Sequence, residues 1–172
     1  MKIFYLGPEG TNSDLAARKI FINNDDFVAV ASIEDIFEKV ALSHSYYGVI
    51  PFENSYQGVI NSSLNCLIDY DLKITKEYNF NVSHIFCSSN NKLNTNDVKK
   101  ITSHPQVFGQ CNNWIRKNYP NAEKIVSTST AEAAANAKDD CSMFCIANSH
   151  AVKIFGLHAH VADIQDRSDN KT

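Results

Sequence analysis

The stretch Lys2–Ile20, KIFYLGPEGTNSDLAARKI, contains the pattern from which the fold class follows. An apolar run over Lys2–Leu6 predicts a strand, and the Gly-Pro pair directly after it ends that strand in a turn. Residues 11–13, Thr-Asn-Ser, are all helix N-cap types, and the apolar residues among 15–20 recur at helical spacing. A strand that passes through a tight turn into a helix is the building unit of an α/β protein.

The same unit recurs along the chain. We predict further strands over 27–31, 47–52, 100–103, 123–127, 143–147 and 161–164. We predict helices starting after Ser32 and over 59–70, 105–119, 131–138 and 149–155, with long extended strands over 71–88. Alternating strands and helices predict parallel sheets covered on both faces. We therefore expect an α/β fold of two lobes with a cleft between them, lobe one about 1–76 plus 158–172 and lobe two about 77–157.

Length and composition restrict the class of protein. At 172 residues, with 44% hydrophobic and 20% charged residues, the chain suits one globular domain, or one domain in two lobes. Its 16 basic and 19 acidic residues, with only three arginines, argue against a nucleic-acid partner. No apolar run approaches the roughly 18 residues of a membrane span, and the N-terminal run is too short for a secretory signal. Five cysteines without a Cys-x-x-Cys pair indicate reduced thiols and a cytoplasmic protein.

Two of the predicted strand-to-helix turns carry groups that suit an anion. In the first turn, Gly10 and Thr11 offer a backbone N–H and a hydroxyl at a helix start, which favours an anion by roughly 0.3–1 kcal/mol per interaction. In the second turn, Ser127, Thr128 and Ser129 offer hydroxyls. An ordinary tight turn with an N-cap is the more common arrangement at the first turn, whereas capping and anion binding are equally supported at the second.

Other polar residues also follow predicted strands. Glu53 comes directly after an apolar strand, and burial there would make it a proton donor, whereas a solvated loop glutamate is the simpler alternative. On the helix expected over 105–119, Gln110 belongs to a row of amides that either lines a cleft or faces solvent. His158 and His160 would face the same way on a strand, which is weak support for zinc, and we predict no metal site. The polar end 165–172, taken alone, predicts a frayed tail.

Taken in order, these segments resemble the catalytic domain of the prephenate dehydratase family. Five of the family's motifs are matched: Gly-Pro-x-Gly-Thr at 7–11, Pro-x-Glu-Asn-Ser-x-x-Gly at 51–58, Ser-His-Pro-Gln with a later Gln-Cys at 103–111, a Ser-Thr helix start at 127–134, and Ile-Gln-Asp followed by Asn-x-Thr at 164–172. Two features depart from the family pattern. Asn12 stands where an aromatic residue is usual, and the family's Arg-Phe pair does not follow Thr172.

The resemblance implies a fold like that of type II periplasmic binding proteins. It also implies conversion of prephenate to phenylpyruvate, water and carbon dioxide, with no cofactor and in a homodimer. Thr172 would contact or protonate the leaving hydroxyl, and Glu53 would contribute to activity. The residues that would position the substrate are Asn54, Ser55, Ser103 and Gln110. We expect the turns Gly7–Thr11 and Ser127–Thr130 to hold its carboxylates.

Two alternatives stay open. A non-catalytic module that binds a small carboxylate could use the same fold. An arogenate dehydratase is the second alternative, because arogenate differs from prephenate only by an amine in place of a keto group. Most family members also carry a C-terminal ACT domain that binds phenylalanine. The sequence contains none, so we expect no feedback inhibition, and truncation of a longer enzyme is the simplest explanation.

Overall fold

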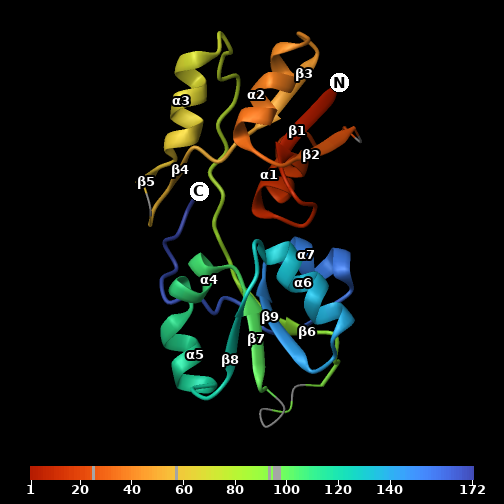
Figure 1. The fold of residues 1–172 in the computed structure, drawn as a ribbon, viewed down its shortest axis with the longest axis vertical. Coiled ribbons are helices and arrows are strands. Elements are labelled where there is room, and N and C mark those ends of the chain that lie inside the picture. The colour runs from red at the N-terminus through yellow and green to blue at the C-terminus, as the bar shows by residue number, and fades with distance from the viewer. Residues whose placement is uncertain (25, 57, 93, 95–97) are drawn as a thin grey trace. The chain divides into compact units, whose positions relative to one another are not determined.

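The computed structural model describes residues 1–24, 26–56, 58–92, 94 and 98–172. The chain folds into two compact units, Met1–Val82 with Asp169–Thr172, and Ser83–Ser168 (Figure 1). The chain passes from the first unit to the second after Val82 and returns to the first unit after Ser168. Both boundaries lie later in the sequence than those expected near 76 and 157. The second boundary moves because β10 (His158–Val161) is paired with β6 (Ile85–Ser88) and therefore belongs to the second unit.

The first unit is built on a three-stranded parallel sheet with the order β2-β1-β3. Its strands are β1 (Lys2–Leu6), β2 (Phe27–Val30) and β3 (Tyr46–Val49). The central strand β1 buries Ile3 and Tyr5 in one cluster with Ala17 of helix α1 (Asn12–Ile20). Helix α2 (Ile33–Ala41) lies so close to β3 that a Cβ atom at Gly48 would be 2.4 Å from Cγ2 of Ile36.

Local capping signals start the first two helices where the sequence predicts. The hydroxyl of Thr11 accepts a hydrogen bond from the backbone N–H of Asp14 in α1. Ser32 and Asp35 form a reciprocal capping box at the start of α2. A short antiparallel hairpin, β4 (Glu53–Asn54) and β5 (Gly58–Val59), precedes α3 (Asn61–Asp69). The hairpin is the element that presents the Glu-Asn-Ser sequence.

The C-terminal end of the chain belongs to the first unit, where its label lies beside β4 and β5 (Figure 1). Its last residues are hydrogen-bonded on two sides. On one side, the Thr172 N–H donates to the Phe80 carbonyl at 2.9 Å and the Phe80 N–H donates to the Thr172 carbonyl at 2.8 Å. On the other side, the Ser55 N–H donates to the Lys171 carbonyl at 2.9 Å. The expectation of a frayed tail is therefore wrong for this segment, because both sides of its backbone are paired.

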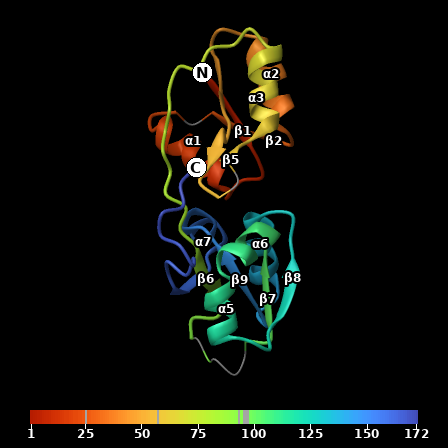
Figure 2. The ribbon, with the colours of Figure 1, turned by 90° about the vertical axis from the view of Figure 1, so that its left-hand side faces the viewer.

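The second unit contains a five-stranded sheet in the order β10-β6-β9-β7-β8 (Figure 2). Strands β7 (Lys100–Ser103), β8 (Glu123–Val126) and β9 (Met143–Ala147) are parallel, whereas β6 is antiparallel to both β9 and β10. The helices are α4 (Pro105–Gln110), α5 (Asn112–Asn118), α6 (Thr130–Asp139) and α7 (Ser149–Phe155). In one core cluster Phe86 stacks on Phe144, with ring centroids 5.2 Å apart. A second cluster contains Ala133, Ala134 and Ala137 of α6.

The structure corrects several expectations about elements. The helix expected over 105–119 is interrupted at Cys111 (φ −118°, ψ 17°), because the Asp166 carboxylate accepts from the backbone N–H groups of Asn113 and Trp114 and starts a new helix. The strand expected over 161–164 lies at His158–Val161, where pairing with β6 fixes it. Within 71–88, Ile85–Ser88 is the strand that the structure contains, and its antiparallel pairing makes the sheet mixed rather than parallel.

Candidate functional site

The side chains of Asn54 and Thr172 form the central contact of the first unit's candidate site. Asn54 Nδ2 donates to Thr172 Oγ1 at 2.7 Å, and it also lies 3.2 Å from Asn170 Oδ1. Asn54 Oδ1 accepts from the backbone N–H of Tyr56 at 2.9 Å, which fixes the orientation of the amide. Because Asn54 presents a donor, Thr172 Oγ1 acts as acceptor in this contact and its own proton is free to be donated elsewhere.

Ser55 holds the backbone on which Thr172 sits. Its N–H donates to the Lys171 carbonyl at 2.9 Å, and its Oγ accepts from the Lys171 N–H at 3.0 Å. The hydroxyl expected to position substrate is therefore used to clamp the residue before Thr172. Ser55 therefore contributes to the site by holding the backbone of Lys171, directly before Thr172.

Glu53 and Asn54 are neighbours on β4 with opposite exposure. Asn54 is buried and Glu53 is exposed, as expected for successive side chains on a strand. No hydrogen bond among the described residues joins Glu53 to Thr172. The structure therefore brings Asn54, Ser55 and Thr172 together and leaves Glu53 in solvent, without the burial that would make it a proton donor.

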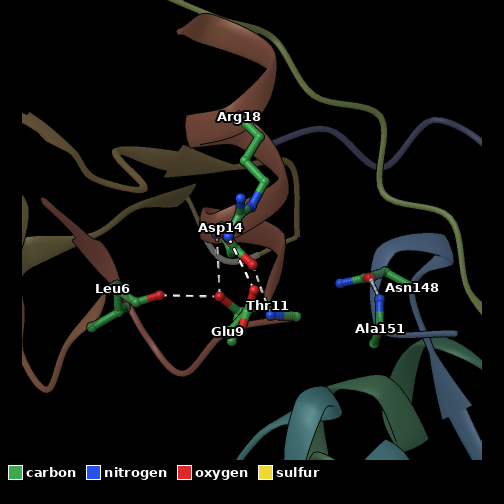
Figure 3. Close-up of polar contacts among 8 residues, drawn as sticks. Leu6, Glu9, Thr11, Asp14, Arg18, Asn148 and Ala151 are labelled. Atoms are coloured by element: carbon green, nitrogen blue, oxygen red, sulfur yellow. Dashed lines mark hydrogen bonds and ion pairs between the residues drawn. The ribbon is translucent and has the colours of Figure 1, made fainter. Parts of the chain in front are cut away.

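The turn at Gly10 and Thr11 already holds a carboxylate of the chain itself (Figure 3). The Gly10 N–H donates to Asp14 Oδ2 at 2.8 Å, and the Thr11 hydroxyl donates to the Leu6 carbonyl at 3.1 Å. Arg18 Nε in turn donates to Asp14 Oδ1 at 2.8 Å. Burial, with a contribution from the Asp14 charge, raises the pKa of Tyr5 to about 12. The groups expected to cradle a substrate carboxylate thus bind Asp14, which is the capping alternative.

The turn before α6 is likewise occupied by a side chain of its own helix. Ser129 is the N-cap, and its Oγ accepts from the Glu132 N–H at 3.0 Å. Thr128 donates both its N–H and its hydroxyl to Glu132 Oε2, and these hydrogen bonds lower the pKa of Glu132. Ser127 is buried, with its Oγ 2.8 Å from Thr102 Oγ1. Of the two alternatives for these hydroxyls, capping is the one that the structure contains.

Ser103 and Gln110 both lie buried in the second unit. Ser103 Oγ, at the end of β7, donates to the Ile146 carbonyl at 2.7 Å. Gln110 Oε1, at the end of α4, lies 2.6 Å from Nε2 of His84. Burial raises the pKa of the neighbouring Cys111 thiol to about 12, so that this cysteine is not a thiolate nucleophile at neutral pH.

His84 and Asn170 are two candidate site residues that the sequence analysis did not select. His84 is 1% exposed, and its Nδ1 has no hydrogen-bond partner in the described part of the chain. Asn170 is also 1% exposed, and its Nδ2 likewise has no partner there, although its Oδ1 contacts Asn54. The signal for His84 was a histidine directly before the apolar strand that begins at Ile85, a pattern that burial alone explains equally well.

Groups able to hold a metal are not found in the described ranges, since no three His, Cys, Asp or Glu side chains gather there. A separate finding concerns membranes: no helix among the residues that the structure describes is long and apolar enough to cross one.

Comparison with known proteins adds to this geometry. A family model described as prephenate dehydratase matches residues 3–172. The bifunctional chorismate mutase/prephenate dehydratase of Pseudomonas aeruginosa is 34% identical over 173 residues, which cover 100% of this chain and 47% of that protein. The prephenate dehydratase of Lactococcus lactis subsp. lactis is 31% identical over 175 residues, which cover 100% of this chain and 61% of that protein. The chain therefore spans about half the length of the first of these relatives.

A solved structure supports the same assignment. The crystal structure of the prephenate dehydratase from Staphylococcus aureus matches with a TM-score of 0.86 and 26% identity, over 99% of this chain and 63% of that chain. The expected α/β fold with two lobes is confirmed by this match and by the two units of the chain. The Asn54–Thr172 contact lies within the residues that the family model covers. These findings together show that the chain belongs to the prephenate dehydratase family.

Proposed function

We propose that this chain converts prephenate to phenylpyruvate, carbon dioxide and water. The observation that carries the proposal is the hydrogen bond from Asn54 Nδ2 to Thr172 Oγ1, in a chain that matches the family over residues 3–172. A hydroxyl that accepts from a fixed amide can donate its own proton in another direction. The leaving group of prephenate is a hydroxyl, which needs such a donor.

The reaction requires little from the protein besides positioning and proton donation. The C–C bond to the ring carboxylate breaks and releases carbon dioxide, and its electron pair enters the ring. The C–O bond to the ring hydroxyl breaks at the opposite carbon, and the hydroxyl leaves as water after taking one proton. The ring becomes aromatic, so the driving force lies in the substrate and no external oxidant or reductant is consumed.

In this proposal Thr172 donates the hydrogen bond to the departing hydroxyl. A threonine hydroxyl is a weak acid, so it acts as a relay that passes a proton to the leaving group and regains one from solvent. Positioned proton transfer of this kind contributes about 10²–10⁴-fold to a rate. Asn54 holds Thr172 Oγ1, and Ser55 holds the backbone of Lys171 directly before it.

Other expected roles remain part of the proposal and are supported by the family motifs. Ser103 and Gln110 bind the substrate through their polar side chains, and Glu53 assists through solvent from its exposed position. We also propose that the chain is a catalytic domain that acts in the cytoplasm as a homodimer. Light scattering after size-exclusion chromatography tests the oligomeric state. The free cysteines Cys66, Cys87, Cys111, Cys141 and Cys145 support a reducing compartment.

The test is to incubate the purified chain with prephenate at neutral pH and to follow phenylpyruvate by its absorbance in alkali. We expect turnover that depends on Thr172. Prephenate binding measured by calorimetry without product formation would overturn the proposal in favour of a non-catalytic carboxylate-binding module. A parallel reaction with arogenate, followed through phenylalanine formation, identifies which of the two ring acids the chain prefers.

A further inference from the structure

We propose that His84 is a positioning residue that fixes the side-chain amide of Gln110, so that the amino group of Gln110 faces the substrate as a hydrogen-bond donor. The two residues are 26 positions apart in the sequence, and their side chains meet at 2.6 Å in the interior of the second unit. The inference rests on the proposed function, because it assigns a reason for the placement of a proposed substrate-binding residue.

The two side chains meet through Oε1 of Gln110 and Nε2 of His84. Gln110 Oε1 is a carbonyl oxygen and can only accept, so Nε2 of His84 must carry the proton and donate it. If the amide were turned round, its NH₂ would donate to Nε2, and the single proton of the neutral ring would have to lie on Nδ1. Nδ1 would then be a buried donor without a partner among the described residues. The observed arrangement leaves only an unpaired acceptor at Nδ1, which is less costly.

The surroundings of the His84 ring determine its protonation state. The ring is 1% exposed, and none of its hydrogen bonds among the described residues is to a charged group. Burial lowers the pKa of His84, against the smaller opposing effect of the Gln110 hydrogen bond. The imidazole is therefore neutral at pH 7, with one N–H, and that N–H is directed at Gln110.

Hydrogen bonds to the backbone of His84 and Gln110 fix both partners. The His84 N–H donates to Gln165 Oε1 at 3.0 Å, and the His84 carbonyl accepts from the Ile164 N–H at 3.1 Å. The Gln110 carbonyl accepts from the Asp166 N–H at 2.7 Å. One short segment, Ile164–Asp166, thus holds the backbone of both residues in register. Each end of the His84–Gln110 contact therefore has its own backbone hydrogen bond to this segment.

The His84–Gln110 contact leaves the amino group of Gln110 available to a ligand. With Oε1 of Gln110 engaged by His84, Nε2 of Gln110 points the other way from the same carbon. That nitrogen donates no hydrogen bond to another described residue, although Gln110 is only 5% exposed. Two N–H groups held in this way suit an oxygen acceptor, and the keto acid and carboxylate groups of prephenate are acceptors of this class.

The test compares three substitutions at position 84. His84→Gln places an amide nitrogen close to the position of Nε2 and keeps a donor for Gln110. His84→Asn reaches only to the position of Nδ1, and His84→Leu removes the donor. We expect kcat/KM with prephenate to fall about 5- to 100-fold in His84→Leu and His84→Asn, and to stay within about 3-fold of wild type in His84→Gln.

A double-mutant cycle separates positioning from general destabilisation. If His84 acts through Gln110, the His84→Leu/Gln110→Ala double variant will be no slower than Gln110→Ala alone. Losses that multiply would overturn the proposal, as would wild-type kcat/KM in both His84→Leu and His84→Asn. Thermal unfolding of each variant confirms that the fraction folded at the assay temperature is unchanged.

A readout that does not need turnover keeps this proposal distinct from the proposed function. In ¹H–¹⁵N spectra the side-chain NH₂ of Gln110, assigned by its loss in Gln110→Ala, should shift in His84→Leu and return toward its wild-type position in His84→Gln. It should also shift when prephenate is added. A chain that shows these shifts but makes no phenylpyruvate retains the His84–Gln110 relationship and loses the proposed reaction. An unmoved Gln110 signal in His84→Leu overturns the relationship itself.

Discussion

Asn54 Nδ2 lies 2.7 Å from Thr172 Oγ1, although the two residues are 118 positions apart in the sequence. The contact sets the direction of the threonine proton, because the amide can only donate at this nitrogen. It depends on the pairing of the last residues with Phe80 on one side and with Ser55 on the other. The site in this unit is therefore made of the C-terminal segment and the hairpin at Glu53–Val59 together.

Removing the Thr172 hydroxyl should reduce turnover without removing the fold. We expect kcat for prephenate to fall by about 10²–10⁴-fold in Thr172→Val, which keeps the shape of the side chain, and to be largely retained in Thr172→Ser. The measurement is phenylpyruvate formation under saturating prephenate. Thr75→Ala is the matched control, since Thr75 is an exposed threonine of the same unit. Equal rates for Thr172→Val and wild type would exclude the relay.

Replacing the Asn54 amide tests the polarity of the same contact. Asn54→Asp substitutes acceptor oxygens for Nδ2, so that the Thr172 hydroxyl must donate to residue 54 and can no longer donate to a leaving group. We expect kcat to fall to nearly the level of Thr172→Val. Asn54→Ala should in addition lower the free energy of unfolding by about 1–3 kcal/mol, because buried partners such as Asn170 Oδ1 lose their donor. Urea unfolding followed by circular dichroism measures the second effect, and unchanged kcat in Asn54→Asp would contradict the first.

His84 should make the protein sensitive to mild acid. Burial lowers its folded-state pKa below the ordinary value of 6.5. As pH falls through 6.5, the unfolded chain therefore takes up a proton that the folded chain does not. The contribution of neutral His84 to the free energy of unfolding is complete above pH 6.5. It is lost as the pH falls from there through the folded-state pKa.

Urea midpoints measured between pH 8 and pH 5 test this expectation. His84→Gln should flatten the fall relative to wild type, whereas His44→Gln, at an exposed histidine of the other unit, should leave it unchanged. His160 also has a pKa lowered by burial and by His158, so part of the slope remains in His84→Gln. An identical slope in wild type and His84→Gln would contradict the prediction.

Two glycine-to-alanine changes should have opposite effects on stability. At Gly48 a Cβ atom would lie 2.4 Å from Cγ2 of Ile36, so Gly48→Ala should cost about 1–3 kcal/mol through overpacking between β3 and α2. At Gly109, on the exposed face of α4, a Cβ atom meets nothing within 4 Å. Gly109→Ala should therefore stabilise by about 0.5–1 kcal/mol through its helix propensity. Thermal unfolding midpoints measure both changes. A midpoint of Gly48→Ala equal to that of wild type would contradict the close approach of α2 to β3.

Local patterns were enough to place several elements. The expected ranges of β1, β7, β9 and α7 coincide with those in the structure, and Thr11 and Ser32 cap the helices that their positions predict. Strands alternating with helices also gave the α/β class. These features depend on residues within about four positions of each other, which is the range over which periodicity and capping act.

The arrangement of the site depends on longer-range pairing. The sequence motifs identified Asn54, Thr172 and Gln110 as candidate residues. They did not predict that Thr172 contacts Asn54 or that Gln110 contacts His84. They also did not reveal that Asp14 and Glu132 occupy the two turns predicted to hold substrate carboxylates. Such contacts arise only when strand pairing fixes the register of distant segments. The sequence by itself therefore determined the elements and the candidate residues, whereas tertiary structure decided which of them meet and which are engaged by the chain's own side chains.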